Sequence, residues 1–185
     1  MSLSFFFESS PQTSHSSCII PAMKLIDEKF KQDPKHYILQ TLLAFVAVAV
    51  IVTVFGVLTS GVIVAALGAS AFVVFATPHS STARPRNVIG GHVLCMAIGL
   101  LCSIPFRFDL LAFNEHTAGI LGAAAVALSI FVMVVTDSEH PPAAGNALAF
   151  TITTVDFEHI LFTLGAVMAL SLVRYALRNW LRDLT

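Results

Sequence analysis

The chain has 185 residues, of which 56% are hydrophobic and only 11% charged, and its formal net charge is −1. With a mean hydropathy of +0.84, it has far less polar surface than a soluble domain of this length needs. The composition therefore excludes an ordinary soluble domain, indicates an integral membrane protein, and gives no sign of a nucleic-acid partner.

The N-terminal residues 1–36 differ from the rest of the chain, because they begin Ser-rich and carry four lysines. These are Lys24, Lys29, Lys31 and Lys35. We expect a disordered or interfacial tail. Two interpretations stay open: translation starts at Met23, or residues 24–36 form an amphipathic helix on the membrane surface.

No Asp, Glu, Lys or Arg lies between His36 and Arg84. This stretch is long enough to cross a bilayer core of about 30 Å twice, at about 20 residues per crossing. We predict a hairpin of segments 38–58 and 61–77, linked at residues 59–61. Further apolar segments are predicted at 88–105, 117–136, 143–155 and 160–177. The predicted fold is an all-α membrane protein, a compact bundle of about six segments over residues 37–180, followed by a short end at 181–185.

Segment 143–155 is too short for an ordinary crossing, so the sidedness of the basic residues is informative. Lys and Arg favour the cytoplasmic side of short loops. If segment 143–155 crosses, the basic residues of the chain other than Arg107 all fall on the side of the N-terminal lysines. We therefore predict six segments in a cell membrane, with both termini cytoplasmic; a re-entrant segment 143–155 is the alternative.

A charged, proline-broken stretch at 136–146 separates segments 117–136 and 143–155. Charged groups and freed backbone are expensive in hydrocarbon, so such a break usually lines a loop, a cavity or a pathway. A similar break at 78–87 also follows a threonine and also contains Pro and His. The pair predicts a parallel two-hairpin repeat, of the kind that marks binding sites in transporters. The likeness is a few residues long, so chance explains it equally well.

The helix that follows each break begins with unpaired N–H groups and a positive dipole end, which favours anions. The candidate anion-binding residues are His140, Pro141, Pro142, Asn146, His79, Ser80, Arg84, Arg86, Asn87 and His92. Each main candidate also has a structural interpretation. The arginines could only enforce topology, His140 could only cap a helix, and His92 could be a core histidine bonded to a neighbouring carbonyl.

No cofactor or metal is expected, because no HxxxH or HExxH spacing places two histidines on one helix face. A membrane-embedded enzyme acting on a lipid-soluble substrate is an alternative, although no nucleophile with a paired base is recognisable in the sequence. A non-transporting membrane subunit is a third possibility.

The stretch His140-Pro141-Pro142-Ala143-Ala144-Gly145, with the run from Pro78 to His92 upstream, resembles the HPP family of integral membrane proteins over about residues 38–178. The resemblance implies a small helical transporter, with plant chloroplast and cyanobacterial relatives associated with nitrite. It also implies four spans, fewer than the six predicted segments. Our leading hypothesis is a transporter or channel for a small anion such as nitrite, with His92 or His140 taking a proton. Because one bundle of this size is slim for a wet path, a homo-oligomer is also expected.

Overall fold

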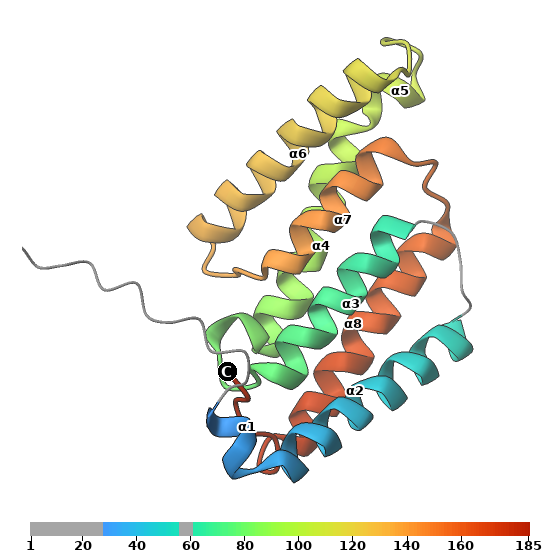
Figure 1. Cartoon of the computed structure of the whole chain (residues 1–185). Helices are drawn as coiled ribbons and strands as arrows, with labels where there is room; N and C mark the ends of the chain where they lie inside the picture. The colour runs from blue at the N-terminus through green and yellow to red at the C-terminus, as the bar shows by residue number, and fades with distance from the viewer. Residues whose placement is uncertain (1–27, 56–60) are drawn as a thin grey trace, which may run out of the picture.

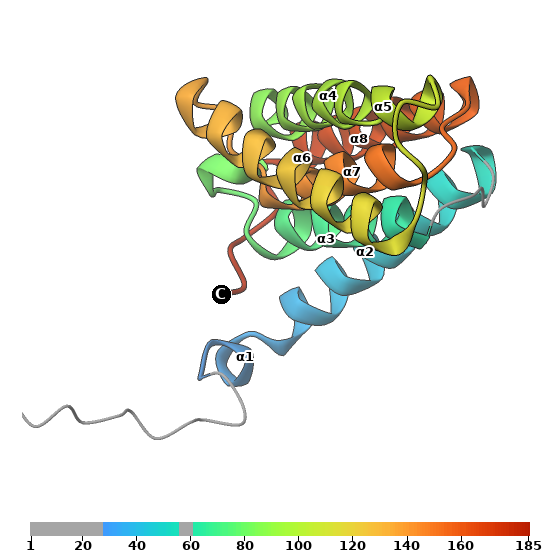
Figure 2. The same cartoon turned by 90° about the horizontal axis from the view of Figure 1, so that it is seen from above.

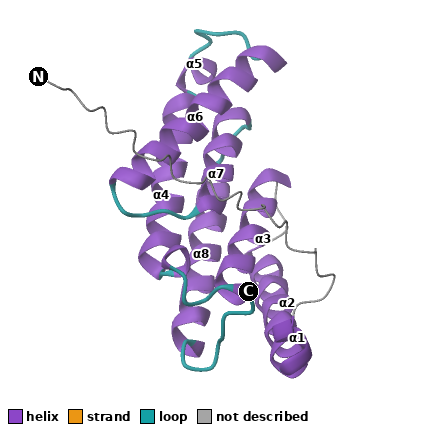
Figure 3. Ribbon diagram, turned by 60° about the vertical axis from the view of Figure 1, so that its left-hand side comes forward, coloured by secondary structure: helices purple, strands orange, loops and turns teal. Residues whose placement is uncertain are grey.

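The computed structural model describes residues 28–55 and 61–185, and every regular element in these two ranges is helical (Figure 3). The elements are α1 (Glu28–Gln32), α2 (Pro34–Phe55), α3 (Gly61–Ala76), η1 (Ser81–Ala83), α4 (Pro85–Cys102), α5 (Ile104–Arg107), α6 (Glu115–Val135), α7 (Pro141–Ile152) and α8 (Phe157–Leu177). The predicted all-α bundle with six apolar segments is confirmed, as α2, α3, α4, α6, α7 and α8. The predicted link between α2 and α3 lies mostly outside the described residues.

Both polar breaks and the C-terminal segment lie at one end of the bundle (Figure 1). Thr82 in the first break accepts a hydrogen bond from His140 in the second. The backbone N–H of Leu184 donates to Ala76 O at the end of α3, and Arg182 pairs with Asp33 just before α2. We refer to this as the break end.

Six helices therefore alternate in direction between the break end and the far end. Four of them, α2, α4, α6 and α8, are long and apolar enough to span a membrane by length and composition. Helix α3 has 16 residues and α7 has 12, so α7 is only about 18 Å long at about 1.5 Å per residue. Residues 153–156, with Thr153 and Asp156 in extended conformation, complete its path to the start of α8. Four long helices and two short ones reconcile the four spans that the resemblance implies with the six predicted segments.

Helices α4 and α7 form the central pair of the bundle, and α2 and α6 lie at its outer edges (Figure 1). In the view from above, α2 packs against α3 along part of its length and slants away toward α1 (Figure 2). Glycine permits the closest approach between the central pair. A Cβ on Gly99 of α4 would lie 2.6 Å from Ala147 O and 2.8 Å from Phe150 Cβ. Small residues at helix contacts let membrane helices pack closely, so the central packing of α4 on α7 depends on this position.

Candidate functional site

The second break starts where α6 ends in a Schellman motif. The N–H of Ser138 donates to Met133 O and that of Asp137 to Val134 O, which satisfies carbonyls at the end of the helix. Asp137 adopts φ 51°, the left-handed conformation that the residue after such an end requires. The chain thus turns back toward the bundle at Asp137, and α7 begins only four residues later.

His140 is the N-cap residue of α7, followed by two prolines in the first helical turn. Proline suits this position because its missing N–H would be unpaired anyway. The imidazole makes no capping bond and points into the bundle, where it is fully buried. Its Nδ1 lies 2.8 Å from Thr82 O and its Nε2 lies 3.0 Å from Ser70 Oγ. His140 therefore joins the second break to the first break and to α3.

His92 on α4 faces the same serine. Its Nδ1 lies 2.8 Å from Val88 O, one turn earlier on the helix, and its Nε2 lies 3.4 Å from Ser70 Oγ. The bond to a neighbouring carbonyl is the one that the structural interpretation of His92 predicted. The two imidazole centroids are 5.1 Å apart, so His92 and His140 form one buried pair with Ser70 between their Nε2 atoms.

This histidine pair lies well inside the bundle rather than at its surface. Ser70 lies six residues before the end of α3 and His92 seven residues after the start of α4, which places both about 10 Å inside the helix ends at about 1.5 Å per residue. The backbone of the second break reaches this depth because Gly91 lacks a side chain: a Cβ there would lie 3.0 Å from His140 Cβ and 3.1 Å from Ser138 O. The second break is therefore recessed into the bundle.

Asn146, about one turn into α7, is buried, and its Oδ1 has no hydrogen-bond partner among the described residues. It lines a cavity of about 10 Å³ together with His92 and with Phe162 and Thr163 of α8. A cavity of this size holds about one water molecule. Asn146 therefore presents an acceptor without a partner beside two buried histidines, and a buried polar atom of this kind calls for an explanation.

Two residues of the first break contact the second break without touching the histidine pair. The side-chain amide of buried Asn87 donates to Glu139 O at 3.3 Å. Arg86 donates to Thr136 O at 3.1 Å and pairs with Asp137 at 3.3 Å, with both charged side chains exposed. Asp137 in the second break is thus an arginine partner. An exposed ion pair contributes at most about 1 kcal/mol, so these contacts align the breaks more than they stabilise the fold.

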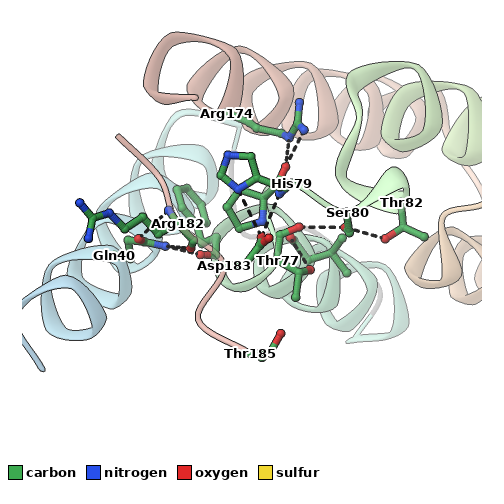
Figure 4. Close-up of polar contacts among 12 residues, drawn as sticks. Gln40, Thr77, His79, Ser80, Thr82, Arg174, Arg182, Asp183 and Thr185 are labelled. Carbon is green, nitrogen blue, oxygen red and sulfur yellow. Dashed lines mark hydrogen bonds and ion pairs between the residues drawn. The ribbon is translucent and has the colours of Figure 1, made fainter. Parts of the chain in front are cut away.

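Other predicted site residues lie away from the histidine pair. Exposed His79 contacts Asp183 of the C-terminal segment through its backbone N–H at 3.0 Å and through Nδ1 at 3.4 Å. Ser80 bonds locally to Thr77 and Thr82, and Arg174 of α8 donates to Pro78 O (Figure 4). Arg84 is exposed at the start of α4. The outer side of the first break is therefore held by the C-terminal part of the chain.

The first turn of α7 offers fewer donors to an anion than the sequence pattern predicts. Pro141 and Pro142 have no N–H, and the N–H of Ala143 donates to His140 O at 2.9 Å. None of these first three residues leaves an N–H free. An anion at this helix start would therefore have to be bound by side chains rather than by these N–H groups.

The sequence gives no sign that Ser70 and Thr82 belong to the site. Ser70 lies in a run of small residues that indicates close helix packing, and Thr82 contributes only its backbone carbonyl. Ser70 Oγ lies 3.0 Å from His140 Nε2, a hydroxyl–imidazole contact that the sequence does not reveal. Only the rotation of α3 about its axis, which tertiary packing decides, reveals that this hydroxyl faces two imidazoles.

The comparisons with known proteins agree with this architecture. The model of the HPP transmembrane region matches residues 29–183. Two transmembrane proteins of Dictyostelium discoideum are 36% identical over 87 residues and 38% identical over 80 residues. These matches cover 47% and 43% of this chain but only 29% and 24% of the relatives' own lengths. No solved structure matches the chain. With most of its length matched by the family model, the chain belongs to the HPP family of transmembrane proteins.

Proposed function

We propose that the chain is a membrane transporter for a small anion such as nitrite, and that the anion moves together with a proton. The observation that carries the proposal is the histidine pair His92–His140, buried about 10 Å inside an apolar bundle beside the unpaired Oδ1 of Asn146. Ionisable residues at such depth in a membrane protein mark pathways for substrates, ions or protons. The family resemblance supplies nitrite as the first anion to test.

The hydrogen bonds of the pair explain why a proton would accompany the anion. A carbonyl oxygen only accepts, so the bonds to Thr82 O and Val88 O place the ring proton of both neutral imidazoles on Nδ1. Both Nε2 atoms are then acceptors, which repel an anion. Protonation turns an Nε2 into a charged N–H donor, and charge-assisted hydrogen bonds are the strong ones. The site therefore suits an anion only after it has taken up a proton.

Transport also requires the helices around the site to separate. The cavity of about 10 Å³ beside His92 and Asn146 has room for about one water and not for a three-atom anion. Helix α8 closes this cavity with Phe162, Ala166 and Val167. These apolar side chains carry no hydrogen bond that would hold the closed arrangement, so movement of α8 against α3 and α4 is the simplest opening.

The test is nitrite uptake into proteoliposomes that contain the purified protein, measured against protein-free vesicles. His140→Ala removes one imidazole of the pair. The matched control is His116→Ala, because His116 is an exposed histidine at the far end, in the first turn of α6. A hydrogen bond from a charged group contributes about 1.5–3 kcal/mol, so we expect His140→Ala to lower the initial rate at least about tenfold while His116→Ala keeps it.

Absence of protein-dependent nitrite uptake would contradict the proposal for this anion, and equal rates in the two variants would contradict the proposed site. Comparable size-exclusion profiles for the two purified variants are needed first. They show that a lost rate reflects the missing imidazole rather than a misfolded protein.

A second candidate, a membrane-embedded hydrolase, has one observation in its favour. Ser70 Oγ and His140 Nε2 are 3.0 Å apart, and Thr82 O orients the ring, which is the spacing of a nucleophile and its base. However, Ser70 is fully buried and also faces a second imidazole. A serine-reactive fluorophosphonate distinguishes the two functions: the transporter predicts no labelling of Ser70, whereas labelling that His140→Ala abolishes would favour the hydrolase.

A further inference from the structure

The hydroxyl of Ser70 has more acceptors around it than it has hydrogens. Its Oγ lies 2.9 Å from Ala66 O, 3.0 Å from His140 Nε2 and 3.4 Å from His92 Nε2. With both Nδ1 atoms donating to carbonyls, neither neutral ring has a proton on Nε2. The single hydroxyl hydrogen of Ser70 cannot donate to the Nε2 lone pairs of both His92 and His140. In the uncharged site, one Nε2 therefore lacks a hydrogen-bond donor.

Adding one proton completes this set of bonds. If His140 Nε2 carries the proton, it donates to Ser70 Oγ, and the hydroxyl of Ser70 donates to His92 Nε2. The two hydrogen bonds then run N–H···O–H···N from His140 through Ser70 to His92, and every polar atom in this series has a partner. The same chain exists in the opposite sense when His92 carries the proton, because the serine oxygen accepts from one ring and donates to the other.

We propose that Ser70 is the bridging residue of a proton relay, through which one proton is shared and passed between His140 at the second break and His92 at the inner cavity. The biological role of this relay rests on the transport function proposed above. The shared proton itself follows from the geometry of the site and does not depend on transport. Ser70 is a positioning and relay residue that carries no net charge at any step.

The transfer balances in a single concerted step. The N–H bond at His140 Nε2 breaks and its proton joins Ser70 Oγ, while the original hydroxyl proton leaves Oγ and forms the N–H bond at His92 Nε2. His140 becomes neutral, His92 becomes the imidazolium, and the serine hydroxyl is regenerated with its hydrogen bond reversed. Rotation of the hydroxyl then resets the relay.

On α3, η1 and α7, which pack around the histidine pair, no other titratable side chain competes for the shared proton. Helix α3 and η1 carry no titratable side chain, and α7 carries none within its bounds. The break end carries Arg84 and Arg86 on the α4 side, Asp137 and Glu139 in the second break, and Arg174 on α8. It also carries the exposed pairs His79–Asp183 and Arg182–Asp33. Arg86 is paired with Asp137, and Arg174 donates to Pro78 O. His159 caps the start of α8 at the far end.

The direct test is ¹⁵N NMR of histidine-labelled protein in nanodiscs, titrated between about pH 4 and pH 8, a range around the ordinary histidine pKa of about 6.5. Variants His92→Gln and His140→Gln assign the two rings. We expect the Nε2 resonances of both rings to shift together as one proton enters the pair. In His92→Gln, His140 should instead titrate alone.

Ser70→Ala removes the bridge and keeps both rings. We expect it to separate the two Nε2 titrations, so that the rings no longer shift together. The matched control is Ser171→Ala, because Ser171 is a buried serine on α8 whose hydroxyl has no partner among the described residues; it should leave the joint titration unchanged. Independent titration of the rings in the unmodified protein would overturn the relay, as would an unchanged joint titration in Ser70→Ala.

Flux measurements separate this inference from the proposed function. If nitrite enters proteoliposomes and Ser70→Ala slows the accompanying proton entry about tenfold, both stand. If nitrite enters at full rate with unchanged proton entry in Ser70→Ala, the relay fails while transport stands. If no nitrite enters, but the two rings titrate together and Ser70→Ala abolishes this joint titration, the relay stands and the transport proposal fails.

Discussion

At the scale of single residues, the buried polar groups divide into those that the sequence reveals and those that it hides. His92, His140, Asn87 and Asn146 stand out because polar side chains next to proline or glycine breaks are rare in apolar segments, and the structure buries all four near one another at the junction of the breaks. Ser70 does not stand out, because serine is common where membrane helices pack closely.

Two other predicted site residues, Arg84 and His79, lie away from the histidine pair. They lie within the first break in sequence, yet Arg84 and His79 are exposed on its outer side. Proximity along the chain does not specify on which side of a turn a long side chain emerges. Packing against α8 and the C-terminal segment decides this, and a local sequence pattern does not contain that information.

Replacement of Asn146 by leucine tests whether the unpaired amide serves function rather than stability. A buried acceptor without a partner costs about 1–3 kcal/mol. We therefore expect Asn146→Leu to unfold at the same or a higher temperature in a detergent thermal-shift assay, while nitrite uptake falls. Ser171→Ala, which removes another buried unpaired oxygen, should share the stability effect without the loss of uptake. Full uptake by Asn146→Leu would remove this residue from the site.

At the scale of helices, the order and number of elements follow from hydropathy, whereas their exact ends follow from local hydrogen bonding. Helix α2 begins at Pro34, within the part assigned to the tail, and α4 ends at Cys102 before a separate short helix at Ile104–Arg107. Helix α6 begins at a capping box of Asn114 and Thr117. Proline, the cap and the Schellman motif determine these boundaries, and hydrophobic segments alone place them only to within a few residues.

The close contact of α4 with α7 predicts a large difference between two glycines. Gly99→Ala places a methyl group against the backbone of α7, and overpacking of this kind costs about 1–3 kcal/mol. A Cβ on Gly119 of α6 meets nothing within 4 Å, so Gly119→Ala gains up to about 1 kcal/mol from helix propensity. Thermal unfolding in detergent should show a lower midpoint for Gly99→Ala and an unchanged or higher one for Gly119→Ala. Equal midpoints would contradict the packing described.

At the scale of the whole molecule, the break end collects both polar breaks, the start of α2 and the C-terminal segment. All of these features were predicted to share a side from the distribution of lysine and arginine alone. The structure brings the two breaks into contact, through Thr82 and His140, and thereby supports α7 as a passage from one end of the bundle to the other. Helix α7 makes this passage with only 12 residues, because its recessed start shortens the path.

Sidedness in the cell follows as a prediction for an impermeant maleimide. Asp137→Cys lies at the break end and Glu115→Cys at the far end, and both positions are exposed. If the break end faces the cytoplasm, Glu115→Cys should react in intact cells, whereas Asp137→Cys should react only after permeabilisation. The unmodified protein controls for its natural cysteines. The reverse pattern would place the termini on the outer side of the membrane.

The central claim is that the buried histidine pair couples a proton to the anion, and the internal pH of proteoliposomes tests it most directly. Nitrite is added outside without a pH gradient, and protein-free vesicles correct for leakage of nitrous acid. One proton per nitrite predicts that the lumen acidifies as nitrite enters, at a rate that a potassium diffusion potential does not change. Nitrite entry without acidification, driven instead by that potential, would contradict the account.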